Sequence, residues 1–138
     1  MSVNFGNLTR LTTIYLQQNE LTSLPDGFGG LSALTTLSLP QNQLVTLPES
    51  FGELKNLSTF DVSSNKLKEL PESFSKLTKL SNFNARSNNI KSLPERFGDI
   101  GASLSVLDLS GNQIDNLPKS IGKLTQLFTL NVSTNQLT

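Results

Sequence analysis

A leucine-based pattern that repeats at a nearly constant spacing constrains this chain more than any other feature of its sequence. One unit, residues 34–56, follows the pattern LxxLxLxxNxLxxLPxxFxxLxx. The leucines that open successive units are Leu11, Leu34, Leu57, Leu80, Leu104 and Leu127, so the period is 23 residues and once 24. A fixed period of this length predicts a solenoid, in which each unit packs only against its neighbours.

The same pattern sets the domain organisation. We interpret residues 1–138 as a single domain made of a half-unit, five full units and a second half-unit. Their ranges are 1–10, 11–33, 34–56, 57–79, 80–103, 104–126 and 127–138. Because both ends fall inside a unit and no polar cap is evident after residue 127, the chain is expected to be a piece of a longer array.

The first half of each unit predicts a short β-strand. Apolar and polar residues alternate there, as in Leu37-Ser38-Leu39, which indicates a strand with one buried face. Six such strands at constant spacing and in one direction predict a parallel sheet. Pro40 follows one of these strands and, since proline removes a ladder donor, is expected to end the strand or to form a bulge; a neutral role is the alternative.

An asparagine follows the last inward-facing residue of each strand by three positions. There the chain must turn away from the sheet, and a side-chain amide can satisfy backbone groups of its own and adjacent turns. The six asparagines are therefore predicted to form a structural ladder: Asn19, Asn42, Asn65, Asn88, Asn112 and Asn135.

The second half of each unit predicts a short helical turn. A Leu-Pro pair excludes a central strand, since proline fixes φ and lacks an N–H, and it fits extended chain or a first helical turn. The apolar residues that follow, as at Phe51 and Leu54, have helical spacing. Short helical or 3₁₀ segments are expected, with the glycines at 29, 52, 98 and 122 permitting a tight bend.

Two irregularities interrupt the pattern. Residues 101–103 carry the single insertion, in the loop that returns to the sheet, where insertions cost little. Ala85 is small in an otherwise larger apolar layer, whereas Phe60 and Phe83 are large where other units have Leu or Ile. Compensating volume within one core is the favoured interpretation, and a cavity is the alternative.

Composition excludes several functions. The chain has no histidine and no cysteine, which removes disulfides, thiol chemistry, most transition-metal sites and the usual general base. Its net charge is zero, so nucleic acid and membrane surfaces are not expected partners. No apolar run is long enough to span a membrane and residues 1–6 do not read as a signal peptide, so a cytoplasmic location is expected.

These repeats resemble the leucine-rich repeat over essentially all 138 residues. The LPxxFGxL half is most similar to the subclass found in Ras-suppressor-like and Scribble-like intracellular scaffolds, in a plant intracellular group, and in some bacterial and protist proteins. The resemblance implies an α/β solenoid, curved into an arc or horseshoe, with a parallel sheet on its concave face. It also implies a protein-binding role on that face, with small GTPases or signalling enzymes as partner classes.

Candidate binding residues lie at outward strand positions, where charges are scarce. We predict a protein-binding patch with Asp61, Asn84, Arg86 and Asp108 at its centre and with Tyr15 and Phe128 as aromatic anchors. Arg86 lies between the two aspartates and could pair with either, and Arg and aromatic residues are favoured at interfaces. The alternative is an ordinary solvated sheet face with a cross-strand ion pair.

The function expected from the sequence is a non-enzymatic scaffold or adaptor module without cofactor or metal. Asp61 and Asp108 could be considered as a catalytic carboxylate pair, but such pairs flank a substrate in a cleft, and an open sheet offers none. Two alternatives remain: a structural spacer that self-associates through its ends, and a bacterial or protist repeat protein that interacts with a host.

Overall fold

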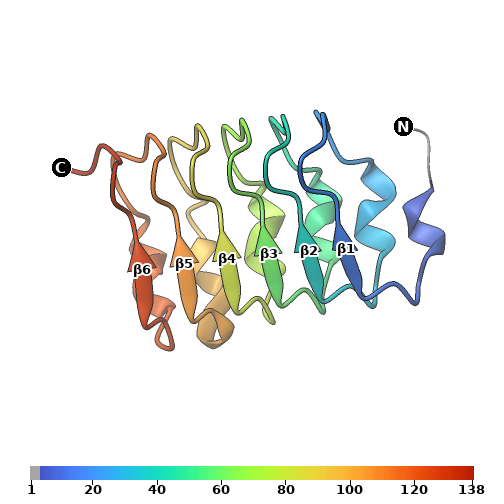
Figure 1. Ribbon diagram of the computed structural model, residues 1–138. Coiled ribbons are helices and arrows are strands. Elements are labelled where there is room, and N and C mark those ends of the chain that lie inside the picture. Colours follow the sequence, from blue (N-terminus) through green and yellow to red (C-terminus); the bar gives the residue numbers. More distant parts are fainter. Residues whose placement is uncertain (1–3) are drawn as a thin grey trace.

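Six parallel strands form one sheet in sequence order, and a row of short 3₁₀ helices lies behind it (Figure 1). The computed structural model describes residues 4–138, so residues 1–3 of the first predicted half-unit lie outside the described part. The strands are β1 (Thr13–Tyr15), β2 (Thr36–Ser38), β3 (Thr59–Asp61), β4 (Asn82–Asn84), β5 (Val106–Asp108) and β6 (Thr129–Asn131). The helices are η1 (Phe5–Asn7), η2 (Asp26–Gly30), η3 (Glu49–Glu53), η4 (Glu72–Lys76), η5 (Phe97–Ser103) and η6 (Lys119–Lys123).

The predicted α/β solenoid with a parallel sheet is therefore confirmed. In β2 to β5 the middle residue is buried and its two neighbours face outward, as the alternating pattern predicts. Equivalent repeat positions pair across the sheet, for example Leu37 with Phe60 and Phe60 with Phe83. This register follows from the constant period, because a slip of one residue would turn every apolar side chain out to solvent.

The Leu-Pro segments lead into the helices in extended backbone. Pro48 has φ −68° and ψ 152° and directly precedes η3, which is polyproline-like geometry. The N–H of Phe51 then donates to the Pro48 carbonyl at 2.9 Å and starts the 3₁₀ turn. That turn points the Phe51 ring into the core, where the side chain is fully buried.

Aromatic rings fill the centre of the solenoid in two rows. Phe51, Phe74 and Phe97 come from the helices, and neighbouring rings stack at 6.0 and 5.9 Å between centroids. Phe60 and Phe83 come from β3 and β4 and stack at 5.6 Å. Ala85 is also fully buried in this region, so its small side chain accompanies the two large strand residues, as compensating volume requires.

The ladder asparagines connect successive units through their side chains. The Asn65 amide donates to the Leu39 carbonyl of the preceding unit and to its own Val62 carbonyl, both at 3.0 Å. Its oxygen accepts the Leu44 N–H at 2.9 Å. Four further asparagines make the equivalent bonds: Asn42, Asn88, Asn112 and Asn135. Asn19 is exposed and donates only within its own turn, to Leu16 and Gln17.

The glycines after the helix aromatics serve close packing, which corrects the expectation of a tight bend. Gly29, Gly52 and Gly98 do not have positive φ. A Cβ built on each would lie 2.2, 2.3 and 1.7 Å from a serine carbonyl oxygen of the next unit. Successive helices approach so closely there that only glycine fits.

The insertion extends the last turn of η5. This element runs to Ser103, six residues after Phe97, whereas η2, η3 and η4 end two residues after the equivalent Phe, and it is kinked at Gly101, which has φ 79°. The insertion is therefore absorbed as an extra turn before the chain re-enters the sheet. No helix within residues 4–138 has the length and apolar character needed to cross a membrane.

Candidate functional site

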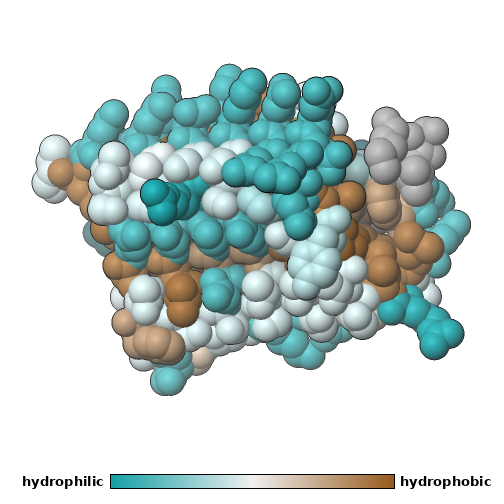
Figure 2. Space-filling view, viewed as in Figure 1, coloured by the Kyte–Doolittle hydropathy of each residue, from teal (hydrophilic) through white to brown (hydrophobic). Residues whose placement is uncertain are grey.

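The candidate site is the outward side of the sheet, called here the strand face. Its middle row is formed by residues that pair across the six strands in one register, namely Tyr15, Ser38, Asp61, Asn84, Asp108 and Asn131. Figure 2, seen from this side, shows mostly polar and intermediate colours across the strands, with hydrophobic surface towards the ends. Burial of one apolar face leaves the other face free to carry recognition groups.

Three of the predicted patch residues accept hydrogen bonds from backbone N–H groups two residues further along the chain. Asp61 Oδ1 accepts the Ser63 N–H at 2.9 Å, and Asn84 Oδ1 accepts the Arg86 N–H at 3.0 Å. Asp108 Oδ1 accepts both the N–H and the hydroxyl of Ser110, at 2.9 and 2.6 Å. These are Asx turns that satisfy backbone donors where each strand ends. The signal in the sequence is an Asp or Asn at the last position of each of these strands.

Pro40 fits the same arrangement. It lies beyond the end of β2, and its carbonyl still accepts the Gln18 N–H at 3.0 Å. The expectation that proline removes a donor of the sheet ladder was wrong. The equivalent N–H groups of Ser63, Arg86 and Ser110 bond to Asx side chains and not to the neighbouring strand. Proline is therefore compatible with this position, where the residue two before it is Ser38 rather than an Asx residue.

Arg86 is the cation at the centre of the strand face. Its side chain is exposed, and within residues 4–138 it forms no ion pair, so the predicted pairing with Asp61 or Asp108 does not occur. The Asx turns explain this difference, because they hold one oxygen of each aspartate against the backbone. The guanidinium is thus left to solvent or to a partner.

A hollow of about 270 Å³ adjoins Arg86. Sequence reasoning missed this feature and the residues that line it, namely Ser87, Ser110, Gly111, Asn131, Ser133 and Thr134. Gly111 precedes the ladder asparagine, a position that has positive φ in every unit, for example 58° at Gln41 and 67° at Gly111. Gly111 adopts this backbone without the strain that a side chain causes, and a Cβ there would lie 3.3 Å from the Ser87 hydroxyl.

The two predicted aromatic anchors lie far from this centre. Tyr15, with 66% of its surface exposed, is on β1. Three strand spacings separate it from Arg86, or about 14 Å. Phe128 is 79% exposed and immediately precedes β6, at a repeat position held elsewhere by threonine or serine. The structure therefore brings Asp61, Asn84, Arg86 and Asp108 together, but it places the aromatics at opposite ends of the face.

The strand face offers polar groups for contacts on an open surface. Among the described residues, no group of three or more His, Cys, Asp or Glu side chains is arranged to hold a metal ion. Asp61 and Asp108 are two strands apart, roughly 10 Å, on an open sheet. Shallow surfaces of hydroxyl, amide and charged groups are suited to contacts with another macromolecule.

Comparison with known proteins gives the same architecture. Three segments of the chain, residues 2–44, 45–90 and 80–137, match the leucine rich repeat family. A leucine-rich repeat protein of Leptospira interrogans is similar in structure, with TM-score 0.71 and 34% identity over 96% of this chain. The ectodomain of the Arabidopsis thaliana receptor kinase GASSHO1/SCHENGEN3, in complex with CASPARIAN STRIP INTEGRITY FACTOR 2, has TM-score 0.87 and 32% identity over 96% of this chain. A chain of the Drosophila Toll–Spatzle complex has TM-score 0.87 and 33% identity over 97% of this chain.

These solved proteins are much longer than this chain. The matched part covers 40% of the Leptospira chain, 17% of the Arabidopsis chain and 18% of the Drosophila chain. No curated protein sequence gives a significant match. The repeat motif, the parallel sheet with 3₁₀ helices and the matches across residues 2–137 agree, and the chain belongs to the leucine-rich repeat family.

Proposed function

We propose that this chain is a protein-binding module whose strand face contacts the partner. The observation that carries the proposal is Arg86, an exposed cation without an ion pair in the described part of the chain, beside a hollow whose other lining residues are uncharged. Arginine is among the residues that contribute most to interfaces, because its planar group can bind a carboxylate through two hydrogen bonds.

Asp61, Asn84 and Asp108 extend the proposed contact area. Each uses Oδ1 for an Asx turn, and among residues 4–138 the second side-chain oxygen of Asp61 and of Asp108 has no hydrogen-bond partner. The turns hold these side chains in one orientation. A partner would therefore meet acceptors that lose little conformational entropy on binding. Tyr15 and Phe128 would add apolar contacts only for a partner that crosses the whole sheet.

Similar solved structures support a protein or peptide as the partner. The Arabidopsis ectodomain and the Drosophila chain were determined in complexes with CASPARIAN STRIP INTEGRITY FACTOR 2 and Spatzle. A scaffold or adaptor role, a small GTPase or signalling enzyme as partner, and a cytoplasmic location rest on the resemblance and composition alone, and they remain part of this proposal.

The test compares capture from a lysate of the source organism by four versions of the chain. These are the wild type, Arg86→Glu, Asp61→Asn with Asp108→Asn, and Lys119→Glu as a control on exposed η6. The asparagine changes remove charge but retain the oxygen that each Asx turn needs. Circular dichroism and thermal unfolding would establish that all four fold alike.

A protein held by the wild type and by Lys119→Glu, but lost with Arg86→Glu, would support binding on the strand face. Loss with the double asparagine variant would add the two carboxylates to the interface. Equal capture by all four versions would contradict the proposal and direct attention to the helices or the ends.

A second candidate, packing through the ends, is favoured by apolar exposure in the last repeat. Leu130 and Leu137 are 45% and 41% exposed, whereas their counterparts Leu107 and Ile114 are buried. In a solenoid such surfaces are covered by an adjoining repeat, supplied by the same protein or by another copy. Sedimentation velocity over a concentration series would test self-association, and a monomer at every concentration would contradict it.

A further inference from the structure

Serines and glycines interlock the helices of adjacent units along the outer side of the solenoid. The Ser50 hydroxyl donates to the Asp26 carbonyl, and the Ser73 hydroxyl donates to the Glu49 carbonyl at 2.6 Å. In each case the glycine one position before the end of the preceding helix, Gly29 or Gly52, leaves room for this serine. At the last junction the Gly98 N–H donates to the Ser120 hydroxyl at 2.9 Å.

The junction between η4 and η5 lacks both partners of this interlock. Ser75 stands where the other units have Gly29, Gly52 and Gly98, and Arg96 stands where they have Ser50, Ser73 and Ser120. The two departures face one another across a single junction. A glycine is replaced by a residue with a Cβ on one side, and the hydroxyl that would enter the space is absent on the other.

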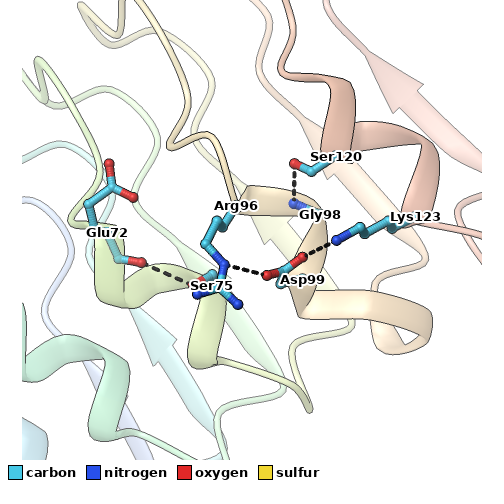
Figure 3. A network of polar contacts seen from close by, with 7 residues as sticks. All are labelled: Glu72, Ser75, Arg96, Gly98, Asp99, Ser120 and Lys123. Carbon is cyan, nitrogen blue, oxygen red and sulfur yellow. Dashed lines mark hydrogen bonds and ion pairs between the residues drawn. The ribbon is translucent and has the colours of Figure 1, made fainter.

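The polar groups at this junction bond within their own units instead. Ser75 Oγ donates to the Glu72 carbonyl at 3.1 Å, so the carbonyl equivalent to those of Asp26 and Glu49 is occupied from within η4 (Figure 3). Arg96 Nε donates to Asp99 at 2.7 Å, and Asp99 also accepts from Lys123 of η6. Figure 3 shows these contacts running from Arg96 through Asp99 to Lys123.

As a result, the helices on either side are not joined by a hydrogen bond. Within residues 4–138, no hydrogen bond or ion pair connects residues 72–77 with residues 94–100. The other interior junctions have the serine interlock and, between η3 and η4 and between η5 and η6, an ion pair. We call the junction between residues 72–77 and 94–100 the outer seam.

Steric exclusion explains why the interlock is absent here. At Gly52, the equivalent of Ser75, an added Cβ would meet a backbone carbonyl at 2.3 Å. The real Cβ of Ser75 requires the following segment to move away, since backbone cannot be displaced as cheaply as a flexible side chain. Consistent with this, η5 begins at Phe97, three residues after Pro94, whereas η4 begins directly after Pro71.

We infer that the outer seam is a flexing point of the solenoid, at which its outer layer opens while the sheet stays paired. On the inner side, the Val62 N–H donates to the Asn84 carbonyl at 2.9 Å, and the Phe74 and Phe97 rings remain stacked. Opening is therefore confined to the outer layer and pivots on the β3–β4 pairing. Asp61 and Arg86 lie on opposite sides of this pivot, so flexing changes the spacing of charges on the strand face.

Native-state hydrogen exchange by NMR can test the inference within one molecule. The amides of Phe51, Phe74 and Phe97 each donate to the proline three residues before, at 2.9 Å in all three cases. The three aromatic side chains are equally buried, so burial and the local hydrogen bond alone predict equal protection. If the seam opens, the Phe97 amide exchanges faster than the other two by roughly two- to tenfold, the effect of one missing hydrogen bond.

Two double variants test whether the missing interlock causes the faster exchange of the Phe97 amide. Ser75→Gly with Arg96→Ser restores the interlock and is expected to slow Phe97 exchange to the rate of Phe51. Gly52→Ser with Ser73→Arg places the same two residue types at the junction between η3 and η4. This variant is expected to accelerate exchange of the Phe74 amide, while the Phe97 amide keeps its wild-type rate. Neither measurement depends on a binding partner, so the result is separate from the proposed function.

Equal exchange of the three amides in the wild-type chain would overturn the inference without any variant. So would an unchanged or faster Phe97 rate in a folded Ser75→Gly/Arg96→Ser protein. If that double variant does not fold, the wild-type comparison and the Gly52→Ser/Ser73→Arg chain still decide the question.

Discussion

The side-chain oxygen of Asn88 accepts a hydrogen bond from the backbone N–H of Leu67, 21 residues earlier, at 3.0 Å. Its amide donates to the Val62 carbonyl of the same earlier unit and to its own Ala85 carbonyl, at 3.1 and 3.0 Å. One buried side chain thus bonds three backbone groups of two units: it shares the Val62 and Ala85 carbonyls with Asn65 and Asn112, and its oxygen is the acceptor for the Leu67 N–H. The solenoid depends on such bonds because its strands are only three residues long.

Replacement of Asn88 by alanine is expected to destabilise the protein by about 1–3 kcal/mol for each buried group left unpaired. Asn19→Ala is the matched control, because Asn19 is exposed and bonds only within its own turn. Urea unfolding of both variants measures the difference in unfolding free energy. Similar losses for Asn88→Ala and Asn19→Ala would show that the ladder bonds contribute little.

Truncation of a strand leucine is expected to cost more inside the array than in its last repeat. Leu107 is fully buried, whereas the paired residue Leu130 is 45% exposed. Leu107→Ala should lose about 2–5 kcal/mol of unfolding free energy, and Leu130→Ala should lose clearly less. Chemical denaturation at several protein concentrations would measure both. An equal loss at Leu130 would indicate that another repeat or another copy covers this residue.

Replacing two equivalent glycines by alanine is expected to change the stability of the protein in opposite directions. At Gly52 an added Cβ would lie 2.3 Å from the Ser73 carbonyl oxygen, whereas at Gly122 nothing lies within 4 Å. Gly52→Ala should destabilise the protein by about 1–3 kcal/mol through overpacking. Gly122→Ala should stabilise it by about 0.4–1 kcal/mol, because alanine restricts the unfolded chain. Thermal unfolding would detect both shifts, and equal effects would refute the close-packing role of Gly52.

Asp99 is expected to make stability depend on pH in the acidic range. Hydrogen bonds from Lys123, and then from Arg96, lower the pKa of Asp99 below its ordinary value of 3.8. A carboxyl with a lower pKa in the folded state stabilises the fold above its unfolded pKa, and this contribution is lost as the pH falls through the folded pKa. The advantage of the wild type over Asp99→Asn should therefore be present at neutral pH and vanish on acidification.

The carboxyl chemical shift of Asp99, followed by NMR titration, provides the direct measurement. In Lys123→Met the pKa of Asp99 should rise towards 3.8, because the largest favourable contact is removed. High salt should diminish the effect, since the pair is partly exposed. A titration midpoint that Lys123→Met leaves unchanged would contradict this account.

Much of the fold could be predicted from the sequence because the information is local and recurs in register. The repeated spacing placed the strands around Leu37, Phe60 and Leu107 and the turns after each Leu-Pro pair. The patch residues were less predictable. The position of Arg86 on the strand face followed from alternation, but the lack of an ion pair depended on how the Asp61 and Asp108 oxygens met nearby N–H groups.

The sequence by itself determined a parallel solenoid with buried leucines and a row of ladder asparagines, because alternation, helical spacing and a fixed period each act over a few neighbouring residues. Only the tertiary structure decided which positions touch across units. The crowding of Gly52 against Ser73 and the missing hydrogen bond between Ser75 and Arg96 involve residues 21 positions apart. Such contacts depend on ångström-scale distances between neighbouring helices, and these are set by the packing of whole units rather than by the pattern within one.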